Sequence, residues 1–184
     1  MSALAVAWLL FFLAFVAGHL RVRKQRRSAP TKEDRVLRAP ASNYGLLLQG
    51  VALSLAAAFH THPRPSWAPA VWILAYGSVA FGAWALLTLG RHWRIQAVVT
   101  ADHELITAGP YALVRHPVYL ALFGMLAATL LARAPWPAAL VSIVIYLAGT
   151  EIRVRAEDGI LARTFGQAFE SYRRSTAAYL PWLR

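Results

Sequence analysis

Apolar residues occur along this chain in long stretches that short polar segments separate. Three stretches come near the roughly 20 residues that a helix needs to cross about 30 Å of hydrocarbon, and two shorter ones follow. In chain order they are Ala3–Leu20, Tyr44–Phe59, Trp67–Leu89, Pro117–Ala132 and Trp136–Thr150. The pattern predicts an all-α membrane protein with about five transmembrane helices.

The last two stretches are short, and the sequence RAPWP separates them. At about 1.5 Å per residue, each would form a helix of only about 22–24 Å. We therefore expect a helical hairpin over residues 117–150 that crosses with local thinning of the bilayer or does not cross fully. At its corner, a helix stop, an interfacial aromatic and a helix start are supplied by Pro135, Trp136 and Pro137.

The basic residues predict the orientation in the membrane. Seventeen of the 19 Arg and Lys residues follow the first, third or fifth stretch, which leaves Arg64 and Arg133 for the opposite side. Since cytoplasmic loops are rich in Arg and Lys, we expect the amino terminus outside and the carboxyl terminus in the cytoplasm. The lack of a targeting signal and the short loops favour a prokaryotic plasma membrane.

Composition supports a membrane protein and narrows its partners. The chain has 184 residues, of which 58% are hydrophobic, and a formal net charge of +11. In a soluble protein that charge would suggest nucleic acid. Here apolar stretches separate the basic residues, so anionic membrane lipids are the expected partner and nucleic acid is not. No cysteine is present, which excludes disulfides, thiolate metal sites and a cysteine nucleophile.

The chain divides into two expected regions. Residues 1–88 would hold the first three membrane helices and a basic cytoplasmic loop over residues 21–43. Residues 89–184 would hold the hairpin and a cytoplasmic tail, which begins as a helix that stops near Gly166. The aromatic residues of a second amphipathic piece follow in the tail: Phe169, Tyr172 and Tyr179.

Two cytoplasmic segments at membrane edges are unusually polar. The first, RIQAVVTADHELITAGPYALVRHPVY, contains a Gly-Pro turn and then His116 before a proline that can start a helix. The second, EIRVRAEDGILARTFGQAFESY, places Arg153 and Glu157 four residues apart on one helix face. Each feature also has a structural explanation. His116 could be a helix cap or surface residue, Arg115 could anchor at lipid headgroups, and the Arg–Glu pair could add about 0.2–0.5 kcal/mol to the helix.

In combination and order, these residues resemble the isoprenylcysteine carboxyl methyltransferase family, integral membrane enzymes that use S-adenosylmethionine. The family pattern runs from Gln through His-x-Leu-hydrophobic, Gly-x-Tyr and Arg-His-Pro-x-Tyr to Arg-x-x-x-Glu-Glu, Leu and Phe-Gly-x-x-Tyr-x-x-Tyr. The matching string here is Gln96, HELI, GPY, RHPVY, RVRAED, Leu161 and FGQAFESY, followed by YLPWL. The resemblance extends over Leu89–Leu183, about half of the chain.

The resemblance implies a cofactor site built from both polar segments. Its expected residues are Gln96, His103, Glu104, Leu105, Ile106, Tyr111, His116, Pro117, Tyr119 and Glu157. Arg153 matches the arginine on the substrate side, which makes Arg153 and Glu157 the expected catalytic residues. Two positions depart from the family pattern: Asp158 replaces the second Glu, and Phe169 replaces a Tyr.

The residue types suit S-adenosylmethionine. Tyr111 and Tyr119 offer ring surface and hydroxyls, and the HELI backbone can hydrogen-bond an adenine edge. Glu157 could bind the ammonium or ribose, and His116 could bind the carboxylate. Methyl transfer needs mainly alignment in a dry site. We therefore expect cytoplasmic loop and tail helices to form a cofactor pocket at the membrane edge. The lipophilic acceptor would be a prenylcysteine-like carboxylate, a thiol or an amine.

Two other functions stay open. Sterol C14-reductases share a related membrane architecture and use NADPH, but they are larger and have more helices. A non-catalytic membrane scaffold is the other alternative, although a scaffold would not need the matched polar residues together. A metal site is not expected, because the six histidines are scattered and His60 and His62 fit a loop beside Pro63.

Overall fold

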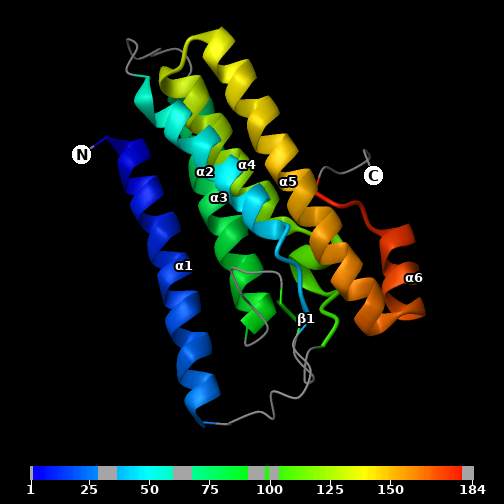
Figure 1. The fold of residues 1–184 in the computed structure, drawn as a ribbon. Coiled ribbons are helices and arrows are strands. Elements are labelled where there is room, and N and C mark those ends of the chain that lie inside the picture. Colours follow the sequence, from blue (N-terminus) through cyan, green and yellow to red (C-terminus); the bar gives the residue numbers. More distant parts are fainter. Residues whose placement is uncertain (1, 29–36, 60–67, 91–97, 100–103, 180–184) are drawn as a thin grey trace.

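The computed structural model describes residues 2–28, 37–59, 68–90, 98–99 and 104–179, which form a bundle of helices (Figure 1). The α-helices are α1 (Ala3–Ser28), α2 (Ser42–Ala58), α3 (Ala68–Leu89), α4 (Pro117–Arg133), α5 (Trp136–Phe165) and α6 (Gln167–Ser175). The remaining elements are a 3-10 helix, η3 (Gly109–Ala112), and two short antiparallel strands, β1 (Leu37–Arg38) and β2 (Val98–Val99). The long helices lie side by side with alternating direction, and α6 lies beside the C-terminal part of α5.

The expected all-α membrane architecture is confirmed. By length and composition, three of the described helices can cross a membrane: Ala3–Val22 within α1, all of α3 and all of α5. Helix α4 is a shorter apolar helix of 17 residues. It follows His116 and ends at the predicted Pro-Trp-Pro corner, where α5 begins. The chain is therefore an integral membrane protein.

Helix α5 differs from the expectation of a short membrane stretch followed by a separate tail helix. It is one continuous helix of 30 residues from Trp136 to Phe165. No proline interrupts its second half, and it ends where Gly166 adopts a positive φ of 53°. At about 1.5 Å per residue it is about 45 Å long, which exceeds an apolar core of about 30 Å. The polar second half of α5 is therefore a rigid continuation of its membrane part, and it extends past the apolar core of the bilayer.

The packing of α2 against α5 depends on two glycines. A Cβ atom on Gly45 would lie 2.4 Å from the carbonyl oxygen of Gly149 and 2.6 Å from Cγ of Arg153. One turn further along α2, the Gln49 side-chain amide donates a buried hydrogen bond of 2.9 Å to the Thr150 hydroxyl. Small residues let two helix backbones approach closely in a membrane. This close approach places α2 directly against the turn of α5 that carries Arg153.

Apolar packing joins the other helices in two clusters. The first lies between α1, α3 and α4 and contains Leu4, Ala7, Phe11, Val71, Ala75, Ala121, Met125 and Ala128. The second lies between α2, α4 and α5 and contains Ala52, Ala56, Leu126, Leu130, Ala134 and Tyr146. Large apolar side chains on the outer surfaces of these helices are exposed, as expected for surfaces that face lipid. Helix α4 contributes residues to both clusters, and this packing fixes its position in the bundle. The position of its first residues is thereby fixed as well.

Candidate functional site

The Arg-His-Pro sequence lies where α4 begins, and the C-terminal segment pairs with it. The backbone amide of Arg115 donates to the Ala177 carbonyl and that of His116 donates to the Ala178 carbonyl, both at 2.8 Å. Pro117 is the first residue of α4, where its fixed φ and missing amide hydrogen suit a helix start. The segment after α6 therefore fixes the backbone of Arg115 and His116 through these two hydrogen bonds.

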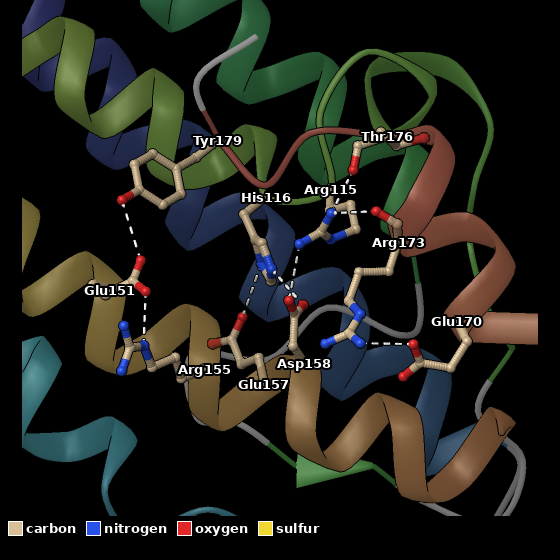
Figure 2. Close-up of polar contacts among 10 residues, drawn as sticks. All are labelled: Arg115, His116, Glu151, Arg155, Glu157, Asp158, Glu170, Arg173, Thr176 and Tyr179. Carbon is tan, nitrogen blue, oxygen red and sulfur yellow. Dashed lines mark hydrogen bonds and ion pairs between the residues drawn. The ribbon is translucent and has the colours of Figure 1, made fainter. Parts of the chain in front are cut away.

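His116 is buried between two carboxylates of α5 (Figure 2). Its Nδ1 atom lies 3.4 Å from Oε2 of Glu157, and its Nε2 atom lies 3.0 Å from Oδ1 of Asp158. Burial alone would lower the pKa of His116, but hydrogen bonds and charge from Asp158 and Glu157 outweigh it and raise that pKa to about 9. The ring is therefore an imidazolium at neutral pH. His116 occupies the N-cap position of α4, as the structural explanation expects, but its side chain makes no capping hydrogen bond and turns to the carboxylates instead.

Arg115 points into the protein rather than toward lipid headgroups. Its Nη2 atom lies 3.0 Å from Oδ2 of Asp158, and its side chain is only 4% exposed. Its Nη1 atom donates to the carbonyl oxygen of Arg173 at 3.1 Å and also to that of Thr176. The explanation of Arg115 as a headgroup anchor is therefore wrong. Arg115 instead joins the start of α4 to α5, to α6 and to the segment that follows α6 (Figure 2).

Tyr119 connects Arg153 and Glu157 on α5. Its hydroxyl donates to Oε1 of Glu157 and accepts a hydrogen bond of 2.7 Å from Nε of Arg153. The guanidinium carbon of Arg153 also lies 5.1 Å from the centre of the Tyr119 ring, within the range of a cation–π contact. Arg153 and Glu157 themselves are 3.5 Å apart between Nη2 and Oε1. The expected contact between Arg153 and Glu157 therefore forms, and the Tyr119 hydroxyl bonds to both of its members.

The Tyr119 ring and backbone are also fixed. Its ring stacks on that of His116, with centres 5.6 Å apart and an angle of 14° between the planes. The Tyr146 hydroxyl donates to the Tyr119 carbonyl oxygen at 2.8 Å. We call the six interacting side chains the ionic cluster: Arg115, His116, Tyr119, Arg153, Glu157 and Asp158. Its charged groups are a His, two Arg and two carboxylates, and each of them contacts a group of opposite charge within the cluster.

The structure brings together four of the residues expected from the sequence, namely His116, Tyr119, Arg153 and Glu157. Tyr111 is buried nearby in η3, where its carbonyl oxygen accepts a hydrogen bond of 2.6 Å from the Tyr172 hydroxyl. Burial, and then the charge of Glu157, raise the pKa of Tyr111 well above its usual range, so this phenol stays neutral.

The remaining expected residues lie before η3 or at the start of α4. Pro117 is buried as the first residue of α4. The segment before η3 contains an exposed Glu104 and half-buried Leu105 and Ile106, and these residues are not among the partners in the contacts above. Gln96 and His103, like the loop with His60 and His62, lie outside the described residues.

Sequence reasoning missed the roles of Arg115 and Asp158. The family pattern presents Asp158 only as a replacement for Glu, yet it contacts both Arg115 and His116. A signal was present: two adjacent cations in RHP and two adjacent acids in AED. In the described part of the chain, no group of three His, Asp or Glu side chains could hold a metal ion. In the ionic cluster, the two nitrogens of His116 face different carboxylates.

The fold and the site define an integral membrane protein with a buried ionic cluster where its apolar helices meet a polar end. Comparison with known families finds a match to the model of the isoprenylcysteine carboxyl methyltransferase (ICMT) family over residues 71–163, which is half of the chain. The chain belongs to this family. The matched region includes the whole ionic cluster, whereas α1 and α2 precede it.

Individual relatives carry different names. The chain is 28% identical over 113 residues to a protein-S-isoprenylcysteine O-methyltransferase of Schizosaccharomyces pombe, covering 54% of this chain and 48% of that one. It is 32% identical over 100 residues to the nickel-cobalt-cadmium resistance protein NccN of Alcaligenes xylosoxydans xylosoxydans, covering 53% and 46%. It is 33% identical over 101 residues to the cobalt-zinc-cadmium resistance protein CzcN of Cupriavidus metallidurans, covering 54% and 46%. The chain thus spans about half the length of these curated relatives.

Proposed function

We propose that this protein is a membrane methyltransferase that uses S-adenosylmethionine to methylate a lipophilic acceptor at the cytoplasmic edge of the membrane. Membership of the ICMT family and the name of the Schizosaccharomyces pombe relative support the reaction type. The observation that carries the proposal is the ionic cluster. It places Glu157, whose side chain is 22% exposed, between a buried imidazolium and the hydroxyl of Tyr119.

The residues present fit this cofactor, which has an ammonium and a carboxylate, ribose hydroxyls, an adenine ring and a sulfonium. Glu157 would bind the ammonium or a ribose hydroxyl, because a carboxylate can accept more hydrogen bonds than its present partners use. Tyr111 and Tyr119 would supply ring surface. Both nitrogens of His116 already face carboxylates, so His116 fits better as the cation that holds Glu157 in place. Gln96, His103 and the segment Glu104–Ile106 are proposed for the adenosine end.

The reaction needs alignment more than it needs acid or base chemistry. When bound, S-adenosylmethionine supplies an electrophilic methyl group for an in-line displacement. Arg153 is proposed to orient the acceptor, and its guanidinium is held by Tyr119 and Glu157, which leaves it few alternative positions. An anionic carboxylate or thiolate would suit this residue. The surrounding apolar helices would exclude water and leave the acceptor's tail in lipid.

The orientation is part of the proposal. Exposed arginines on the polar part of α5 and on α6 (Arg155, Arg163, Arg173 and Arg174) would face anionic lipids on the cytoplasmic side. The amino terminus would then lie outside, in a prokaryotic plasma membrane. This arrangement gives a soluble cofactor and a lipophilic acceptor access to the same site.

The test is methyl transfer by purified protein in lipid vesicles. Vesicles would receive S-adenosylmethionine with a radioactive methyl group and, in separate reactions, a prenylcysteine analogue, a lipophilic thiol or a lipophilic amine. We expect label in one organic-phase product with the wild type and at least a tenfold lower initial rate with Glu157→Ala, since a charge-assisted contact is lost. Equal rates in both proteins would show that the reaction does not use this site.

A further inference from the structure

The two oxygens of the Asp158 carboxylate bind two neighbouring residues of the Arg-His-Pro sequence. Oδ2 lies 3.0 Å from Nη2 of Arg115, and Oδ1 lies 3.0 Å from Nε2 of His116. The Asp158 side chain is 12% exposed. A carboxylate shared by two buried cations is held in one orientation, and it holds both cations in turn.

The contact with Nε2 decides what the other ring nitrogen does. The ring plane of His116 is set by stacking on Tyr119 at an angle of 14°. With Nε2 at Asp158, Nδ1 faces Oε2 of Glu157 at 3.4 Å. If the ring rotated by half a turn, both contacts would be lost. Asp158 thus fixes the ring rotation that directs a second N–H toward Glu157.

We propose that Asp158 is a positioning residue that, together with Arg115, holds the His116 ring so that Glu157 is fixed for cofactor binding. The cofactor part of this proposal rests on the proposed function, whereas the bridge between Asp158 and His116 does not. Asp158 would not touch the cofactor itself. Its action would pass through His116 to Glu157.

The Asp158 carboxylate contacts both Arg115 and His116, and its negative charge affects the protonation of His116. Arg115 is a permanent cation whose other bonds go to the backbone carbonyl oxygens of Arg173 and Thr176, which carry no formal charge. Without the charge of Asp158, the imidazolium of His116 would lie next to Arg115 with only Glu157 to balance it. The pKa of His116 would then fall, which shifts the equilibrium toward the neutral imidazole. A neutral His116 can donate only one of its two hydrogen bonds.

Three variants separate a positioning role from a purely structural one. Asp158→Asn keeps the shape and removes the charge, whereas Asp158→Glu keeps the charge and supplies the residue of the family pattern. Glu170→Gln is the matched control, because it breaks the exposed contact of Glu170 with Arg173 without touching His116. Helix content and thermal unfolding would confirm that each variant is folded.

The first readout is the titration of His116, followed by NMR of protein with labelled histidine in detergent and assigned with His116→Gln. We expect the midpoint to fall by about 1 pH unit or more in Asp158→Asn. It should stay close to the wild-type value in Asp158→Glu and in Glu170→Gln. An unchanged midpoint in Asp158→Asn would overturn the proposal, whether or not the protein binds a nucleoside.

The second readout is the affinity for S-adenosylhomocysteine between pH 6 and pH 10. We expect the pH at which affinity falls by half to move down with the His116 midpoint in Asp158→Asn, and Asp158→Glu to restore it. A loss of affinity in Asp158→Asn that is the same at every pH would indicate a structural role and overturn the proposal. If the wild type bound no nucleoside, the proposed function would fail, and the His116 titration alone would decide whether the bridge exists.

Discussion

The Tyr119 hydroxyl donates a hydrogen bond to Oε1 of Glu157, and this contact joins the first turn of α4 to the polar half of α5. The same hydroxyl accepts a hydrogen bond of 2.7 Å from Nε of Arg153. One oxygen atom therefore holds two side chains of opposite charge that lie one helical turn apart. This arrangement fixes the spacing between the carboxylate proposed for the cofactor and the guanidinium proposed for the acceptor.

Replacing Tyr119 by Phe tests that relationship. The ring would remain, but Glu157 and Arg153 would each lose a hydrogen bond, and bonds to charged groups contribute about 1.5–3 kcal/mol. We expect Tyr119→Phe to weaken S-adenosylhomocysteine binding about tenfold, measured by calorimetric titration in detergent. Tyr76→Phe is the matched control, because the Tyr76 hydroxyl bonds the Ala3 carbonyl far from the ionic cluster. Equal affinities in both variants would show that the Tyr119 hydroxyl has no part in binding.

The raised pKa of His116 predicts a pH dependence of stability. This pKa is raised from its usual 6.5 to about 9 in the folded protein. The stabilising contribution is therefore fully present below about pH 6.5 and is lost as the pH rises through 9. We expect the free energy of unfolding to fall by an amount on the order of 3 kcal/mol across that range. Glu157, Asp158 and Tyr119 contact the ring. The nearby cations act through these groups, since Arg115 pairs with Asp158 and Arg153 pairs with Glu157.

Thermal unfolding in detergent at intervals from pH 6 to pH 9.5 would measure this effect. His116→Gln is the control, and its unfolding temperature should change less over the same range, because the titrating group is absent. The carboxylates stay ionised throughout, so they do not produce the slope. A wild-type slope equal to that of His116→Gln would contradict the ionised state assigned to His116.

The glycine contact between α2 and α5 predicts an opposite response at two glycines of α2. In Gly45→Ala the new Cβ would lie 2.4 Å from a backbone oxygen, so α2 would have to move, at a cost of about 1–3 kcal/mol. In Gly50→Ala nothing lies within 4 Å of the new Cβ, and the better helix former should stabilise by up to about 1 kcal/mol. Thermal unfolding of both variants would show the two signs. Equal stability of the two would mean that α2 and α5 are farther apart than described.

The absence of cysteine allows a clean test of orientation. Ser2 and Ser175 are both exposed and lie at opposite ends of the described chain. With a single cysteine at either position, a membrane-impermeant maleimide should label Ser2→Cys in intact spheroplasts and Ser175→Cys only after permeabilisation. The reverse pattern would place the ionic cluster outside the cell and contradict the cytoplasmic site.

Much of the fold follows from local sequence. Apolar stretches of membrane length predict the helices, and the Pro-Trp-Pro corner predicts the boundary between α4 and α5. The continuity of α5 could not be read from hydropathy, because the apolar pattern ends at Thr150 while the helix continues to Phe165. The contact between Gly45 and Gly149 depends on how two distant helices cross. No local pattern contains that information.

The candidate site was predicted to a similar extent. The order of motifs grouped His116, Tyr119, Arg153 and Glu157, and the structure places these four in contact. Arg115 and Asp158 were missed because a single Arg before a membrane helix usually lies at the headgroups, and an acid on a helix is usually solvated. Their pairing requires the C-terminal segment to lie over the start of α4, as the bonds of Arg115 and His116 to Ala177 and Ala178 show.

Cofactor binding by the wild type distinguishes the proposed functions, and calorimetric titration of the detergent-purified protein with S-adenosylhomocysteine would measure it, with NADPH as the control ligand. We expect saturable binding of S-adenosylhomocysteine alone, and affinity weakened about tenfold or more in Glu157→Ala and in His116→Ala. Binding of NADPH alone would point to a reductase. Binding of neither ligand to folded protein would contradict the methyltransferase and favour a non-catalytic membrane protein.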